Sequence, residues 1–178
     1  LPHTHDGFVH MVRIAAYFKA LSEGQLLPRW AGDLNFGYGM PLFNFMYHTP
    51  YLIASLFVAL GASLVNAFKW TLALSYILSG LFIYMFAYSL FNNTKKAMLV
   101  TIFYQFAPFR FVELFVRGSF GEVYTYAFFP LVLYGLVQIV QKKSFGAVLL
   151  TSLAIALLVI SHNSISLALM ATASVFFL

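Results

Sequence analysis

Long apolar runs separated by short polar breaks make up most of the chain. The runs lie near residues 70–91, 97–109, 123–140, 145–161 and 164–178, and a less regular one covers 49–66. A membrane-spanning helix needs roughly 20 apolar residues, so the run at 97–109 is short for a span and we expect it to extend into its flanks. The pattern predicts an all-α fold, a polytopic transmembrane helical bundle with at least four spanning helices.

The first 48 residues follow a different pattern. Between residues 7 and 21 the spacing is helical, and steps of 4, 3 and 4 place four residues in one polar stripe: Asp6, His10, Arg13 and Tyr17. We expect the other side of this helix to face the bilayer, since it carries Phe8, Met11, Ile14, Ala15 and Phe18. Such an amphipathic helix lies along the membrane interface.

This contrast predicts two regions. Residues 1–48 form an interfacial outer loop with an amphipathic juxtamembrane helix, and residues 49–178 form a transmembrane helical domain. The chain begins with Leu1 and ends within an apolar run, so we expect it to be truncated at both ends of a longer protein.

Composition supports a membrane location and excludes several kinds of site. The chain is 62% hydrophobic and only 8% charged, whereas a soluble domain carries about 25% charged residues. The net charge of +5 comes from ten basic and five acidic residues. So few charges do not indicate a basic surface that binds nucleic acid. The absence of Cys excludes disulfides, thiol nucleophiles and Cys-based zinc sites. We expect an integral, multi-pass protein of the plasma membrane in contact with membrane lipid.

Two lysine pairs predict the topology. Two apolar runs separate Lys95 and Lys96 from Lys142 and Lys143, so both pairs lie on one side, which the positive-inside tendency assigns to the cytoplasm. The segment 110–123 then lies on the outer side, as does His162.

The side of Asp6 depends on whether residues 49–66 cross the membrane. If they cross, the N-terminal region is cytoplasmic, and a count of Lys and Arg favours this. If they lie flat, six ionisable residues face the outer side together: Asp6, Arg110, Glu113, Arg117, Glu122 and His162. We favour the flat arrangement, because rare ionisable groups in a membrane domain are expected to serve a common site.

Four segments carry a family resemblance: HDGFVHMVRIAAYFKALSEGQLLPRW, GYGMPLFNF, RGSFGEVYTYAFFPLVLYGL and SHN. With them the chain resembles the 6-pyruvoyl-tetrahydropterin synthase-related membrane domain, which is similar in turn to YfhO-like proteins and to the C-type glycosyltransferase superfamily. That resemblance implies an acidic residue in the first outer loop that acts on the acceptor, a second acidic site in the next outer loop, and a lipid-phosphate-linked sugar as donor. Asp6 matches the first element, and Glu113 or Glu122 matches the second.

Asp6 and Glu122 are therefore the predicted catalytic residues. A carboxylate at a helix start stays ionised, as a general base requires, and we expect His10 and Arg13, one turn further along, to orient it. The alternative is that Asp6 simply caps the helix.

Arg110, Glu113, Arg117 and His162 complete the predicted substrate-binding set. An unpaired cation at the centre of a membrane helix costs about 2.5–3.5 kcal/mol, so we expect Glu113 and Glu122 to pair with the two arginines. Alternatively, one arginine binds a lipid phosphate, and we choose Arg117 because the glycines beside it let backbone approach a ligand. His162 lies between two apolar runs, where it either caps a helix or contacts the ligand.

A divalent metal is the remaining cofactor candidate. His3, His5 and Asp6 carry imidazole and carboxylate groups that could hold Mg²⁺ or Mn²⁺, and hydrogen bonding at the interface is the alternative role for the two imidazoles.

Together these features predict a membrane glycosyltransferase that moves a sugar from a polyprenyl-phosphate donor to an acceptor on the outer face. The alternative is a non-catalytic protein that binds lipid or assists transport, in which the polar cluster holds headgroups without chemistry.

Overall fold

A computed structural model describes residues 4–176, and the regular elements within this range are helices. They are, in chain order, α1 (Gly7–Ser22), the 3₁₀ helix η1 (Leu42–Asn44), α2 (Thr49–Ala59), α3 (Leu64–Phe91), α4 (Thr94–Gln105), α5 (Pro108–Phe111), the π-helical turn η2 (Val112–Arg117), α6 (Glu122–Lys142), α7 (Phe145–Ser161) and α8 (Asn163–Phe176). The predicted all-α class is confirmed.

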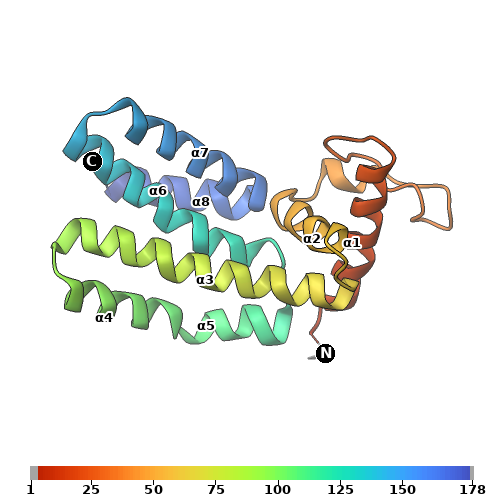
Figure 1. The fold of residues 1–178 in the computed structure, drawn as a ribbon, viewed down its shortest axis with the longest axis horizontal. Coiled ribbons are helices and arrows are strands. Elements are labelled where there is room, and N and C mark those ends of the chain that lie inside the picture. Colours follow the sequence, from red (N-terminus) through yellow and green to blue (C-terminus); the bar gives the residue numbers. More distant parts are fainter. Residues whose placement is uncertain (1–3, 177–178) are drawn as a thin grey trace.

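The long helices run side by side and form the body of the molecule (Figure 1). Helix α6 packs against α3 and α7, and α4 packs against the other side of α3. Gly135 allows the approach of α6 to α7, because a Cβ at this position would lie 3.1 Å from the Cα of Thr151. Helices α1 and α2 pack on each other and on α3, at one end of the body (Figure 1).

Within residues 4–176, two helices are long and apolar enough to cross a membrane. They are α3, with 28 residues, and α6, with 21 residues. The segment 94–117 adds a third crossing if its two parts form one span, bent by 49°. Helix α7 has 17 residues and α8 is also apolar but short, so the predicted minimum of four crossings depends on these two helices.

The short apolar run at 97–109 is interrupted by Pro108. The residue before a proline is pushed out of the α conformation, and Ala107 accordingly has φ −59° and ψ 127°. The run therefore extends into both flanks, as expected, but with a break between α4 and α5.

Residues 49–66 do not form one continuous helix. Helix α2 has 11 residues, about 16 Å at 1.5 Å per residue, which is about half the hydrocarbon thickness of a bilayer. The chain turns at Gly61, which has a φ of +93°. Helix α3 starts after Ser63, whose hydroxyl accepts a hydrogen bond from the backbone N–H of Asn66.

The two lysine pairs lie at the same end of the bundle, as predicted. The α3–α4 and α6–α7 turns both lie at the end opposite α1 and α2 (Figure 1). The amide of Gln141, near the end of α6, donates to the carbonyl oxygen of Ser89, near the end of α3.

The prediction for the faces of α1 was partly wrong. His10 and Tyr17 are buried, so part of the polar stripe does face the protein. Ile14, which we assigned to the bilayer side, is completely buried. It follows His10 by four residues and therefore shares its face, whereas Phe8 is 74% exposed.

Candidate functional site

The segment before α1 lies directly against the end of η2. The backbone N–H of His5 donates to the carbonyl oxygen of Val116 (3.0 Å), and that of Asp6 donates to the carbonyl oxygen of Arg117 (2.9 Å). The backbone of Asp6 is thereby joined to that of Arg117, although the two residues are far apart in the sequence.

Two glycines permit this approach. Gly118 ends η2 with a φ of +67°, and a Cβ on it would lie 2.5 Å from the hydroxyl oxygen of Thr4. A Cβ on Gly7 would also collide with that hydroxyl group. A larger residue at either position would separate the two segments.

Asp6 precedes α1, but its side chain does not cap the helix. The residue is half-buried, and its carboxylate accepts no hydrogen bond from the first turn of α1. Within residues 4–176 the Asp6 carboxylate has neither a hydrogen-bond partner nor an ion-pair partner. The capping interpretation is therefore wrong for the side chain, and the carboxylate is free to accept a proton or a ligand hydrogen bond.

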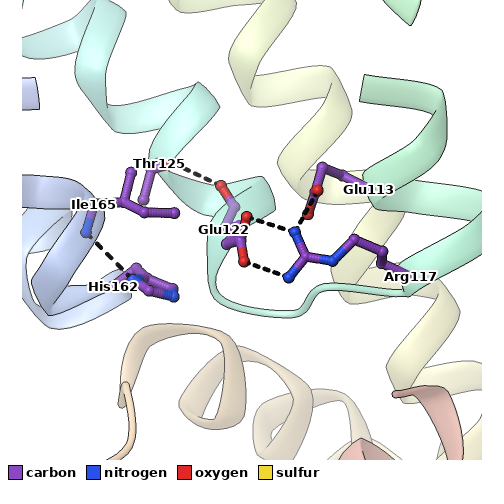
Figure 2. A network of polar contacts seen from close by, with 6 residues as sticks. All are labelled: Glu113, Arg117, Glu122, Thr125, His162 and Ile165. Carbon is purple, nitrogen blue, oxygen red and sulfur yellow. Dashed lines mark hydrogen bonds and ion pairs between the residues drawn. The ribbon is translucent and has the colours of Figure 1, made fainter. Parts of the chain in front are cut away.

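Arg117 is held between two glutamates (Figure 2). Its Nη1 donates to Glu113 Oε1 at 2.6 Å and to Glu122 Oε2 at 3.0 Å, and its Nη2 donates to Glu122 Oε1 at 2.8 Å. Glu113 is fully buried, the Glu122 side chain is 16% exposed and that of Arg117 is 38% exposed. This Glu–Arg–Glu triad is the structural pairing that the sequence suggested for Arg117. Both Nη atoms are hydrogen-bonded to carboxylates, and the two glutamates together carry more negative charge than Arg117 carries positive charge, which disfavours binding of a phosphate.

Arg110 is not paired with a carboxylate in the part of the chain that the structure describes, so the expectation that Glu113 and Glu122 neutralise both arginines was wrong. The guanidinium carbon lies 5.0 to 5.1 Å from the ring centres of Tyr76, Tyr104 and Tyr126. One Nη donates to Ser79 Oγ at 2.7 Å, and only 3% of the residue is exposed. Cation–π contacts are worth about 2 kcal/mol or more in a desolvated site, so the aromatic rings stabilise this charge.

The tyrosine cage around Arg110 consists of residues that were not among the predicted site residues. Its rings come from α3, α4 and α6, and Arg110 contacts Ser79 rather than any predicted site residue. Sequence reasoning missed the cage because its residues are scattered over three apolar runs. The one available signal was the presence of tyrosines within those runs.

His10, Arg13 and His162 meet around two tyrosines that the sequence reasoning did not select. His10 Nδ1 is hydrogen-bonded to the Tyr51 hydroxyl at 2.8 Å. The ring of Tyr47 stacks on Tyr51 and on His162, with centroids 5.6 and 5.5 Å apart. Burial lowers the pKa of His10 to about 3, and the charge of Arg13 adds to this effect. His10 is therefore a neutral member of the cluster at physiological pH.

His162 also lies close to the triad. Figure 2 shows Glu122 between Arg117 on one side and His162 on the other. The Nδ1 of His162 accepts a hydrogen bond from the backbone N–H of Ile165. This is the helix-capping role considered for it, at the start of α8.

The metal prediction falls partly outside the described residues, because His3 is not among them. Within residues 4–176, no three His, Asp or Glu side chains are grouped closely enough to hold one ion. His5 and Asp6 are neighbours in this range and supply two ligand types, so a metal there stays a prediction.

Two apolar grooves reach this end of the bundle. The first, the α3 groove, has a volume of about 580 Å³ and lies between α3 and the α5–η2 segment. Its lining is apolar apart from Thr4, Lys69 and Tyr76. The second, of about 460 Å³, lies between α4, α6 and α8 and includes Glu122. Lys69 is a candidate ligand contact that sequence reasoning missed, since a single lysine at the start of a long apolar run gives little signal.

Comparisons with known proteins identify a family but name no activity. The family model described as "6-pyruvoyl-tetrahydropterin synthase related domain; membrane protein" matches residues 43–178. A protein of Lactococcus lactis subsp. cremoris (strain MG1363), described as an uncharacterized protein, is 23% identical over 163 residues, which cover 89% of this chain and 26% of that protein. The chain thus spans about a quarter of the length of this relative. No solved structure matches the chain.

The matched residues include α3 and α6, the two helices long enough to cross a membrane, as well as the Glu–Arg–Glu triad. The chain therefore belongs to the 6-pyruvoyl-tetrahydropterin synthase related family of membrane proteins.

Proposed function

We propose that the chain forms part of a membrane glycosyltransferase that moves a sugar from a polyprenyl phosphate to an acceptor on the outer membrane face. The observation that carries the proposal is the free carboxylate of Asp6, two residues along the chain from Thr4 in the lining of the α3 groove. The other four acidic residues of the chain each have an ion-pair partner: Glu23, Asp33, Glu113 and Glu122.

The α3 groove supports a lipid-linked donor. Its walls are formed by apolar and aromatic side chains such as Phe68, Leu72, Phe111 and Phe115, which suit an isoprenoid chain. Lys69 is the one cation in its lining. We assign the donor phosphate to Lys69 rather than to Arg117, whose Nη atoms are engaged by the two glutamates.

The proposed reaction is a direct displacement. The acceptor hydroxyl oxygen forms a bond to the anomeric carbon of the sugar while the bond from that carbon to the phosphate oxygen breaks. The polyprenyl phosphate leaves with the electron pair, next to Lys69, and the acceptor proton passes to the Asp6 carboxylate. General-base assistance of this kind contributes about 10²- to 10⁴-fold to a rate.

In this proposal Glu122 acts through Arg117. Both glutamates hold the Arg117 side chain, and the carbonyl oxygen of Arg117 accepts the backbone N–H of Asp6. The triad is then a positioning element for the base. Glu122, predicted as a second catalytic residue, supports Asp6 instead of reacting itself.

The alternative is a non-catalytic lipid-binding or transport-associated protein. The α3 groove and Lys69 would hold an amphiphile equally well without chemistry, and the pairing of Arg117 with two glutamates agrees with a purely structural triad.

Vesicles that contain the chain and radiolabelled polyprenyl-phosphate sugars distinguish the two functions. The glycosyltransferase proposal predicts release of polyprenyl phosphate and transfer of label to an acceptor, in proportion to the amount of chain. Binding of the donor with no release for any sugar or acceptor tested would support the lipid-binding alternative and contradict catalysis.

A further inference from the structure

The end of the bundle opposite α1 and α2 carries a second distinctive feature, an excess of positive charge. Lys95 and Lys96 lie in the first turn of α4, and Lys142 and Lys143 lie where α6 ends. The five acidic residues of the chain lie elsewhere: Asp6, Glu23, Asp33, Glu113 and Glu122. Helix α6 has one acidic residue, Glu122, which lies about 30 Å from Lys142 at 1.5 Å per helical residue.

A cavity opens beside these lysines. It has a volume of about 610 Å³ and lies between the ends of α3 and α6. Unlike the α3 groove, its lining includes several polar side chains, namely Tyr84, Tyr88, Tyr134, Gln138, Gln141 and Lys142. A cavity that is partly polar and open at a lysine-rich end of a membrane protein suits an anionic headgroup.

Gln138 gives a separate indication of a ligand. Only 7% of the residue is exposed, and its Oε1 is buried without a hydrogen-bond partner. Buried polar atoms in folded proteins are nearly always paired, because an unpaired acceptor costs about 1–3 kcal/mol. This oxygen can only accept, so the missing partner must be a donor such as a hydroxyl group.

The flanking surface indicates that the ligand is a lipid. Leu90 and Met85 line the cavity with apolar side chains, and Leu90 is 43% exposed. Acyl chains can lie along these apolar side chains while the headgroup occupies the cavity. A free phosphate ion would leave them uncovered.

We propose that this cavity binds an anionic phospholipid whose headgroup carries hydroxyl groups, as in phosphatidylglycerol. Lys142 contacts the phosphate, and a headgroup hydroxyl donates to Gln138 Oε1. The other three lysines add attraction for the anionic lipid without touching it. This site lies at the opposite end of the bundle from Asp6, so it does not depend on the proposed reaction.

Native mass spectrometry of the detergent-purified chain tests the proposal with three defined lipids. Phosphatidylglycerol and phosphatidylethanol carry the same charge, but only the first has headgroup hydroxyls, and phosphatidylcholine is the neutral reference. A hydrogen bond to an otherwise unpaired acceptor predicts about fivefold to tenfold stronger binding of phosphatidylglycerol than of phosphatidylethanol. The Gln138→Leu variant should lose this preference by weakening phosphatidylglycerol alone.

Two charge variants distinguish direct lipid contact in the cavity from general electrostatic attraction of anionic lipid to this end of the bundle. Lys142→Gln and Lys143→Gln remove the same charge from adjacent residues, but only Lys142 lines the cavity. Lys142→Gln should weaken both anionic lipids more than Lys143→Gln does. Equal binding of phosphatidylglycerol and phosphatidylethanol by the wild-type chain, or equal effects of the two lysine variants, would overturn the proposal. These two comparisons remain decisive even if Gln138→Leu fails to fold.

Discussion

The backbone N–H of Asp6 donates a hydrogen bond to the carbonyl oxygen of Arg117 across 2.9 Å. Through this bond the start of α1 is attached to the end of η2, whose last residue is fixed in turn by Glu113 and Glu122. The backbone of Asp6 is thereby joined to a residue whose side chain is ion-paired. Such support from a second layer of residues is what a catalytic group needs in order to keep a productive geometry.

The triad should contribute strongly to stability. Arg117→Met leaves the fully buried Glu113 without its cation, and an unpaired buried charge destabilises a fold by about 3 kcal/mol or more. We expect a large fall in the unfolding temperature in detergent. Lys19→Met is the control, since it breaks an ion pair with Asp33 in which both side chains are about half exposed, and it should change the unfolding temperature little. Equal effects of the two variants would contradict a structural role for the triad.

Stability should depend on pH through His10. Its pKa falls from the ordinary 6.5 to about 3 in the folded chain, so the unfolded chain binds the extra proton between these values. Stability is therefore complete above about pH 6.5 and falls as the pH drops below it, by up to about 1.4 kcal/mol per pH unit. Thermal unfolding between pH 4 and 8 should show a steeper fall for the wild-type chain than for His10→Gln. Parallel curves would show that His10 does not titrate in this way.

The membrane topology can be tested with single cysteines, because the natural chain has none. Lys95→Cys and Lys143→Cys should react with an impermeant maleimide from the same side of the membrane. Asp33→Cys should react from the other side, because the α1–α2 end lies opposite the two lysine turns. Labelling of residues 33 and 95 from the same side would contradict the proposed outer location of Asp6.

Lys69 should contribute both to donor binding and to departure of the phosphate. Lys69→Gln removes the cation of the α3 groove, and losing a charge-assisted contact with phosphate should raise KM for the donor and lower kcat/KM by about tenfold or more. Arg29→Gln removes an exposed positive charge from the loop after α1 and serves as the matched control. An unchanged KM in Lys69→Gln would show that the phosphate binds elsewhere.

Much of the fold could be predicted from the sequence, because long apolar runs have few alternatives in a membrane protein. The runs predicted α3 and α6 and the extension of the short run 97–109 into its flanks, but not the break at Pro108. The cost of an unpaired cation also indicated that Glu113 and Glu122 pair with arginine, which is confirmed for Arg117. These features depend on residues that are near each other in the chain.

The rest of the site depends on contacts between distant segments. The tyrosine cage around Arg110 combines residues up to 50 positions apart, Tyr76 and Tyr126 among them. The close approach of Asp6 to Arg117 requires Gly7 and Gly118 to face the same threonine. Neither arrangement has a local sequence signature, so the partner of Arg110 was predicted wrongly and Tyr47 and Tyr51 were overlooked.

The central claim is that the Asp6 carboxylate accepts the acceptor proton, and Asp6→Asn tests it most directly. Because this carboxylate has no partner within residues 4–176, the amide should preserve the unfolding temperature and the affinity for a polyprenyl-phosphate sugar. Sugar transfer in vesicles should fall by about 10²- to 10⁴-fold, as expected for loss of a general base. Asp33→Asn, which changes an exposed aspartate of the same N-terminal region, should retain full transfer. Wild-type transfer rates in Asp6→Asn, with donor binding intact, would contradict the account.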